Sequence, residues 1–135
     1  TVAEVQTVVM SGTPTGGTYT LTFDGKETAD IAFDADGDAV QEALRAIPGI
    51  NVPMPEGAFY ALPEVSSFYG KKTPSDKVVA GSLDLCAYLL SDELLAVVPG
   101  AAFGDDRCIR LSYATSMENL EKAMERLRRG LVALT

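Results

Sequence analysis

Histidine is absent from this chain of 135 residues, and cysteine occurs only twice. Without histidine the sequence offers neither a Cys/His zinc site nor a nucleophile activated by histidine, which excludes much hydrolase chemistry. Two cysteines do not make a disulfide framework. Cys86 falls in an apolar helical pattern and Cys108 opens an alternating strand, so we expect two small core residues in a reducing, cytoplasmic setting.

Positive charge is also scarce, with 11 Lys and Arg against 19 Asp and Glu and a net charge of −8. This balance opposes binding to nucleic acid or to anionic membranes, because both depend on clustered Lys and Arg. The one basic cluster, Arg126, Arg128 and Arg129, falls in the last turns of an expected helix, where cations complement the helix dipole. No apolar run is long enough to predict a membrane span. We therefore expect neither nucleic acid nor membrane as a partner.

Among metal-binding motifs, the sequence most nearly matches a calcium-binding loop. Asp34, Asp36 and Asp38 have the alternate spacing of such a loop. However, Ala39 stands where the loop needs glycine, and Arg45 stands where it needs the closing glutamate. Helix capping explains the three carboxylates, and the sequence predicts no bound metal.

The pattern of apolar residues predicts a single domain of the α+β class. Hydrophobic residues form 47% of the chain and charged residues 22%, as in ordinary globular proteins. Alternation in the first half predicts three strands, of which the last two form a hairpin over residues 18–33, and then a helix. The expected strands and helix of the first half cover residues 3–11, 17–23, 29–33 and 39–47.

The second half is expected to contain a strand, a helix, two strands and a final helix. The first four of these elements cover residues 57–65, 83–90, 94–98 and 108–114. The final helix has Thr115 at its N-cap and Glu118 three residues later, the pattern of a capping box. The order βββα then βαββα predicts a two-layer sandwich, with the helices on one face of a mainly antiparallel or mixed sheet.

Five motifs in the second half resemble one enzyme family. They are Pro55-Glu56-Gly57-Ala58-Phe59-Tyr60, Pro63-Glu64-Val65-Ser66, Val98-Pro99-Gly100-Ala101-Ala102-Phe103-Gly104-Asp105-Asp106, Ile109-Arg110-Leu111-Ser112-Tyr113-Ala114-Thr115 and Asn119-Leu120-Glu121-Lys122-Ala123. Together they resemble the C-terminal small-domain segment of aspartate-aminotransferase-type enzymes, which use pyridoxal phosphate. The resemblance covers about residues 50–134.

This resemblance implies one site residue, Arg110, at the position where the family binds the α-carboxylate of its amino-acid substrate. A guanidinium suits that task because its planar fork pairs with a carboxylate through two hydrogen bonds. The family's cleft lies between a small and a large domain. We therefore expect Arg110 to face solvent here, or to pair with Asp105 or Asp106.

The resemblance also implies that the Schiff-base lysine and most of the phosphate site belong to a large domain preceding this segment, which residues 1–49 do not match. Lys71 and Lys72 lie in a Gly/Pro/Ser loop outside the family's lysine motif, where a solvated amine is poorly suited to form a Schiff base. We therefore expect no catalysis by this chain, no cofactor and no small-molecule ligand.

Residues 1–49 resemble a different family, a module of phage tail and other virion proteins. The resemblance rests on the strand over residues 16–23, the strand over residues 28–32 and the helix that ends at Ile50. Both families place a helix, a turn and an apolar residue near residues 47–55, so a join there preserves local geometry. We therefore interpret the chain as an engineered chimera of segments 1–49 and 50–135, without a catalytic function.

Such a hybrid is expected to self-associate, because it exposes apolar surface that once contacted another domain. Two alternatives remain open at this point. One is a natural virion-type structural module that binds another protein. The other is residual binding of an amino acid or a dicarboxylate through Arg110.

Overall fold

The structure is a computed structural model, and it describes residues 18–19, 22–23, 26–27, 31–32, 37–53 and 59–135. Twelve elements lie within this part of the chain. They are β1 (Thr18–Tyr19), β2 (Thr22–Phe23), β3 (Lys26–Glu27), β4 (Ile31–Ala32), α1 (Gly37–Arg45), β5 (Tyr60–Ala61), the 3-10 helix η1 (Ser66–Phe68), α2 (Ser82–Glu93), β6 (Val98–Pro99), the 3-10 helix η2 (Gly100–Phe103), β7 (Ile109–Ser112) and α3 (Met117–Val132).

Two short antiparallel ladders are nested in the first part of the chain. β1 pairs with β4, and β2 pairs with β3 inside that pair. This nesting agrees with the hairpin predicted over residues 18–33. The strand expected over residues 3–11 and two of the three aspartates of the calcium-loop pattern lie outside the described residues.

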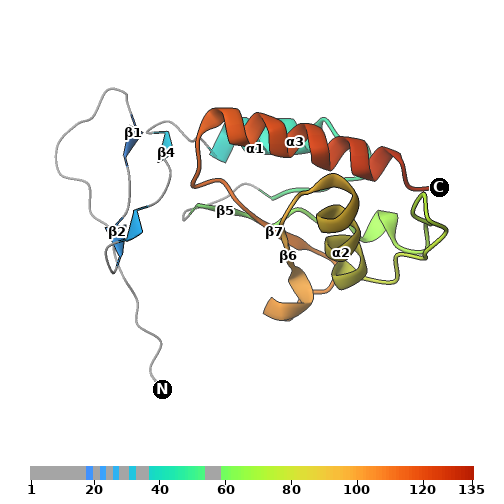
Figure 1. The fold of residues 1–135 in the computed structure, drawn as a ribbon. Coiled ribbons are helices and arrows are strands. Elements are labelled where there is room, and N and C mark those ends of the chain that lie inside the picture. Colours follow the sequence, from blue (N-terminus) through green and yellow to red (C-terminus); the bar gives the residue numbers. More distant parts are fainter. Residues whose placement is uncertain (1–17, 20–21, 24–25, 28–30, 33–36, 54–58) are drawn as a thin grey trace, which may run out of the picture.

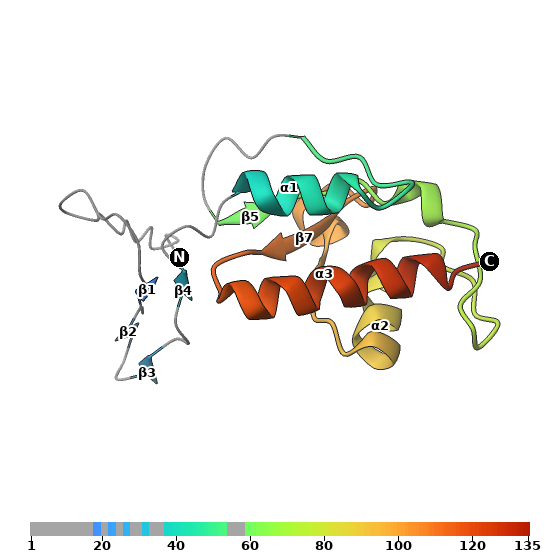
Figure 2. The same ribbon diagram turned by 90° about the horizontal axis from the view of Figure 1, so that it is seen from above.

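The central sheet has three antiparallel strands in the order β5-β7-β6. β7 is therefore the middle strand, and its register sets Tyr60 opposite Ser112 and Val98 opposite Arg110. Figures 1 and 2 show α1 and α3 side by side along the sheet, with α2 beside β6 and against α3. An antiparallel sheet combined with helices confirms the α+β class.

Two parts of the predicted order differ from the structure. Among the described residues, four short strands lie in the region where two were expected over residues 17–23 and 29–33, and the strand expected over residues 94–98 begins only at Val98. Leu94 ends α2 instead, in the left-handed conformation at φ 54°, while the backbone N–H of Leu95 donates to the Leu89 carbonyl. A left-handed residue after the last helical turn is a common way for a helix to end, and apolar alternation does not reveal it.

The start of α3 lies one residue later than the predicted capping box. Ser116 is the N-cap, and its side chain accepts a hydrogen bond from the backbone N–H of Asn119. Thr115 contributes differently, since its hydroxyl accepts from the side-chain amide of Asn119. Both hydroxyl residues precede the helix, so spacing alone could not separate the two assignments.

One hydrophobic core joins the helices to the sheet. Its fully buried members include Leu44 of α1, Leu89 of α2, Ile109 of β7 and Leu127 of α3. Each fully buried leucine or isoleucine contributes about 1.5–3 kcal/mol relative to an exposed one. The residues of α1 therefore belong to the same folded unit as the segment that follows residue 50.

Among the described residues, no helix is both long and apolar enough to span a bilayer.

Candidate functional site

Arg110 lies at the centre of the sheet, on the face turned away from the core. Along β7 the side chains alternate, with Ile109 and Leu111 buried and Ser112 exposed, while Arg110 is partly exposed. This alternation follows from the period of two of a β-strand, which places successive side chains on opposite faces. The guanidinium group is thus presented by the middle strand of the sheet.

Two aromatic rings contact the guanidinium of Arg110. Its Cζ atom lies 4.5 Å from the ring centroid of Tyr60 and 4.3 Å from that of Phe103. Both distances are within the range of about 6 Å in which a cation is attracted by an aromatic face. Tyr60 lies opposite Ser112 in the ladder, so it is a diagonal neighbour of Arg110 on the same face. Phe103 belongs to η2, which follows directly after β6 on the other side of β7.

Two alternatives were expected for Arg110, a position facing solvent or a pair with Asp105 or Asp106, and the pair is not found. In the described part of the chain, no Asp or Glu forms an ion pair with Arg110, and none of its guanidinium N–H groups has a hydrogen-bond acceptor. Asp105 and Asp106 both have other partners, given below. The described contacts of the Arg110 guanidinium are the rings of Tyr60 and Phe103, and not a carboxylate.

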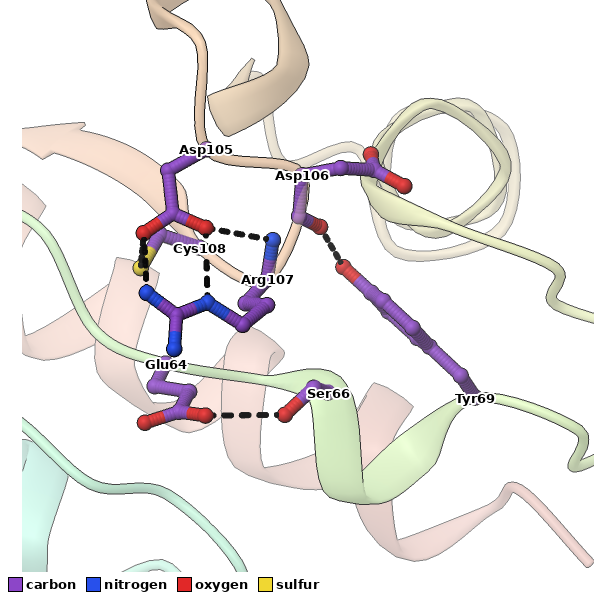
Figure 3. Close-up of polar contacts among 7 residues, drawn as sticks. All are labelled: Glu64, Ser66, Tyr69, Asp105, Asp106, Arg107 and Cys108. Carbon is purple, nitrogen blue, oxygen red and sulfur yellow. Dashed lines mark hydrogen bonds and ion pairs between the residues drawn. The ribbon is translucent and has the colours of Figure 1, made fainter.

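Asp105 binds Arg107 through both carboxylate oxygens (Figure 3). The Arg107 Nε donates to Oδ1 at 2.9 Å and Nη2 donates to Oδ2 at 2.8 Å. Hydrogen bonds from the Arg107 side chain and backbone lower the pKa of Asp105 from 3.8 to about 2, and the same pairing raises the pKa of Arg107. The neighbouring arginine, and not Arg110, therefore uses this carboxylate.

Asp106 links the start of α2 to the turn that carries Phe103. Its Oδ1 accepts from the backbone N–H of Ser82 at 3.0 Å and from the Ser82 hydroxyl at 2.6 Å. The Ser82 oxygen in turn accepts from the backbone N–H of Ala101 in η2 at 3.2 Å. A Cβ atom at Gly81 would lie 2.6 Å from Oδ2 of Asp106, so a larger residue there would have to displace this carboxylate. These bonds fix η2 without any contribution from Arg110.

Tyr69 holds the same loop from the other side (Figure 3). Its hydroxyl donates to the backbone carbonyl of Asp106. Burial and the nearby charge of Asp106 raise the pKa of Tyr69 to about 12, so the phenol stays protonated and remains a donor at neutral pH. Asp106 is therefore held through both its side chain and its backbone carbonyl.

The cysteines have the inert environment expected of structural residues. Cys86 is buried, and burial raises the pKa of its thiol to about 11. Cys108 is partly buried, and burial together with the charge of Asp105 also raises its pKa. Because the thiolate is the reactive form, neither residue is suited to act as a nucleophile at neutral pH.

Pyridoxal phosphate does not fit the described residues on their own. A phosphate cradle needs several backbone N–H groups without partners, but three N–H groups in and just after η2 are engaged: Gly100 donates to Cys108, Ala101 to Ser82 and Gly104 to Ala101. None of the four lysines whose burial the structure describes is buried. Lys72 pairs with Asp76 at the surface, and Lys122 pairs with Glu118 along α3. Groups of three or more His, Cys, Asp or Glu placed to bind a metal are also absent from the described residues.

Comparison with known proteins shows the family to which the chain belongs. The family described as aminotransferase class I and II matches residues 28–127. The chain belongs to this family. The aspartate aminotransferase of Rhizobium meliloti (strain 1021) is 46% identical over 96 residues, which are 71% of this chain and 23% of that protein. The aspartate aminotransferase of Pinus pinaster is 41% identical over 97 residues, 72% of this chain and 20% of that protein.

Solved structures give the same result. The crystal structure of the Rhizobium meliloti aspartate aminotransferase superimposes with a TM-score of 0.71 at 45% identity, over 73% of this chain and 24% of that chain. The aspartate aminotransferase of Thermotoga maritima gives a TM-score of 0.58 at 32% identity, over 71% of this chain and 22% of that chain. The chain thus spans between 20% and 24% of the length of these relatives.

The interpretation of the chain as a chimera is therefore wrong. The family match begins at residue 28 and runs through the proposed join near residue 50, so α1 and the turn after it belong to the aminotransferase family. The core agrees, because Leu44 packs with residues of α2, β7 and α3. The relatives named above are enzymes and none is a virion protein, which also overturns the idea of a virion-type module and of a folding domain unrelated to aminotransferase function.

Tyr60 and Phe103 are the site residues that sequence reasoning missed. Both lie within motifs that carry the family resemblance, yet neither has an ionisable group near neutral pH that would suggest a role in binding. A strand order known in advance could have identified them. The sheet order places β5, which contains Tyr60, and the segment after β6, which contains Phe103, on either side of Arg110.

Proposed function

We propose that this chain is the small-domain segment of a pyridoxal-phosphate-dependent aminotransferase that acts on aspartate or a related amino acid, and that Arg110 binds the α-carboxylate of the substrate. The observation that supports the proposal is the environment of Arg110. Its side chain extends from the central strand β7, is partly exposed, and has no carboxylate partner among the described residues. An arginine of this kind is available to an external carboxylate.

The chemistry of the guanidinium supports this role. Its planar fork can donate two parallel hydrogen bonds to one carboxylate, and such charge-assisted pairs are about twice as strong as neutral hydrogen bonds. Lysine cannot replace it, because an ammonium group is a point charge without the fork. A nearby arginine, Arg107, already forms two hydrogen bonds with the Asp105 carboxylate and therefore serves as an internal comparison.

The names of the relatives support the class of substrate. The Rhizobium meliloti and Pinus pinaster proteins are aspartate aminotransferases, and another relative, from Rickettsia felis, is a probable aspartate/prephenate aminotransferase that is 42% identical over 100 residues. The groups that bind the cofactor would come from the part of such an enzyme that these described residues do not represent. No reaction step is therefore assigned to this segment beyond holding the substrate.

A segment exchange tests the proposal. Residues 28–127 of this chain would replace the matching segment of the Rhizobium meliloti aspartate aminotransferase, and kcat/KM would be measured with aspartate. We expect an active hybrid, and we expect Arg110→Ala to lower kcat/KM on the order of 100-fold, as follows from losing two charge-assisted hydrogen bonds.

The matched control is Arg107→Ala in the same hybrid, because Arg107 is a neighbouring arginine with an exposed ion pair. We expect this variant to retain nearly full activity, since exposed pairs contribute little. Equal activity of the two alanine variants would reject the assignment of Arg110. A large loss in Arg110→Lys would show in addition that the fork, and not the charge alone, is required.

A further inference from the structure

Arg110 is covered by two rings that are themselves well exposed. The residues Tyr60 and Phe103 are 45% and 53% exposed, and they approach the guanidinium from β5 on one side of β7 and from η2, which follows β6, on the other. Aromatic residues normally bury their large apolar surface. Two half-exposed rings that meet on one cation are therefore unlike ordinary core packing.

The rings are held in place independently of Arg110. The backbone pairing of β5 with β7 places Tyr60, and the bonds from Asp106 through Ser82 to Ala101 place the turn that carries Phe103. The arginine side chain, by contrast, has several rotatable bonds and forms no ion pair with a described residue. The positions of the two rings therefore determine the orientation of the guanidinium, and not the reverse.

The stacked geometry leaves the N–H donors at the edge of the Arg110 guanidinium available to a ligand. A guanidinium carries its five N–H donors in its plane, and its faces donate no hydrogen bonds. Stacking on aromatic rings occupies faces and restricts rotation, while the donors at the edge remain free to bind. A side chain fixed in this way loses less conformational entropy when a ligand binds.

We propose that Tyr60 and Phe103 are positioning residues that hold the Arg110 guanidinium in one orientation, so that its N–H fork receives a planar carboxylate at its edge. This proposal rests on the proposed function, because it takes Arg110 as the group that binds the substrate carboxylate. It adds two residues to the site and explains why Arg110 needs no structural carboxylate to hold it.

Nuclear magnetic resonance of the full 135-residue chain tests the proposal directly. We expect the aromatic ring currents to shift the Nε–H resonance of Arg110 upfield of that of Arg107, which has no described ring partner. Phe103→Leu and Tyr60→Leu should each remove part of this shift, whereas Phe103→Tyr and Tyr60→Phe should keep it. Phe59→Leu is the control, because the described ring partner of Phe59 is Tyr113 and not Arg110.

Binding is then measured by titrating each variant with L-aspartate and following the same Arg110 resonance. We expect each leucine variant to raise the dissociation constant roughly two- to five-fold, the effect of losing one exposed cation–π contact. The conservative aromatic variants should restore the affinity, which a loss of general stability would not predict.

The outcomes separate this proposal from the proposed function. An Arg110 resonance that both leucine variants leave unchanged would overturn the positioning role, even if the segment exchange shows that Arg110 is needed for activity. Ring-dependent resonances without any aspartate-dependent shift would also overturn it, because the rings would then position nothing for a carboxylate. If the segment exchange finds Arg110 dispensable while the resonances behave as expected, the proposed function fails instead.

Discussion

Gly130 of α3 lies against Glu93 of α2 so closely that a Cβ atom at position 130 would come within 2.9 Å of the Glu93 Cγ. The same atom would lie 2.8 Å from Cδ2 of Leu89, which is fully buried and has little room to move. The hydroxyl of Tyr88 adds to this contact by donating to the Gly130 carbonyl at 3.0 Å. The two helices therefore approach each other over a residue without a side chain.

Replacing this glycine should destabilise the fold although alanine is the better helix former. Gly130→Ala gains up to about 1 kcal/mol of helix propensity, but forcing a methyl group into this contact costs about 1–3 kcal/mol. We expect a net loss of about 1 kcal/mol in the free energy of unfolding, measured by urea denaturation. Arg128→Ala, at an exposed position of the same helix, is the control and should change stability little. A stabilised Gly130→Ala would contradict the close packing.

Glu93 is held by Arg129 across the same interface. The Glu93 side chain is only 9% exposed, and its Oε2 lies 2.7 Å from Nε and 2.6 Å from Nη2 of Arg129. Arg129→Met should therefore lower the urea midpoint, since it leaves a mostly buried carboxylate without its partner. Lys122→Met removes the exposed pair with Glu118 in the same helix and should have a smaller effect. Equal midpoints for the two variants would show that Glu93 is solvated.

The pairing of Asp105 with Arg107 predicts that the stability of the fold decreases at low pH. The folded state lowers the pKa of Asp105 from 3.8 to about 2, so the carboxylate stabilises the fold above pH 3.8 and this contribution is lost as the pH falls toward about 2. A titration of the Asp105 carboxyl carbon by nuclear magnetic resonance should show the low midpoint.

The variants for this titration distinguish the two arginines. In Arg107→Ala the midpoint should rise toward the ordinary value near about 4, because the hydrogen bonds that favour the charged form are gone. In Arg110→Ala it should not move, since Arg110 does not contact Asp105. A shift in the second variant would show that the two arginines share this carboxylate.

The identity and class of the second half could be predicted from the sequence because its signals are local. The alternation of Ile109, Arg110, Leu111 and Ser112 specifies a strand with one buried face, and the structure confirms it. The spacing of Leu120, Leu127 and Leu131 specifies a helix that packs on the core, and these residues are buried in α3. Periodicity is sufficient where a single face is buried.

The site could be predicted only in part, because its geometry depends on contacts between distant segments. The motif pointed to Arg110, but it did not show that Tyr60, from a strand early in this segment, and Phe103, from the turn before β7, both contact its guanidinium. One of the two alternatives expected for Arg110 was a pair with Asp105 or Asp106. The sequence could not show that these carboxylates bind Arg107 and Ser82 instead. The same reliance on local pattern placed a join near residue 50, within a core that the structure shows to be continuous.

The exposed surface of α2 supports the expectation of self-association, which stays a proposal. Leu83 and Leu90 lie two helical turns apart on α2, Leu94 follows at its C-terminal end, and all three are exposed, Leu94 by 70%. A stripe of this kind favours contact with a second apolar surface. We expect the 135-residue chain to show a mass above 14.3 kDa that rises with concentration in sedimentation experiments, and Leu90→Lys to shift it toward the monomer. Val132→Lys, at an exposed apolar position of α3, should leave the association unchanged, and a monomer at every concentration would reject the proposal.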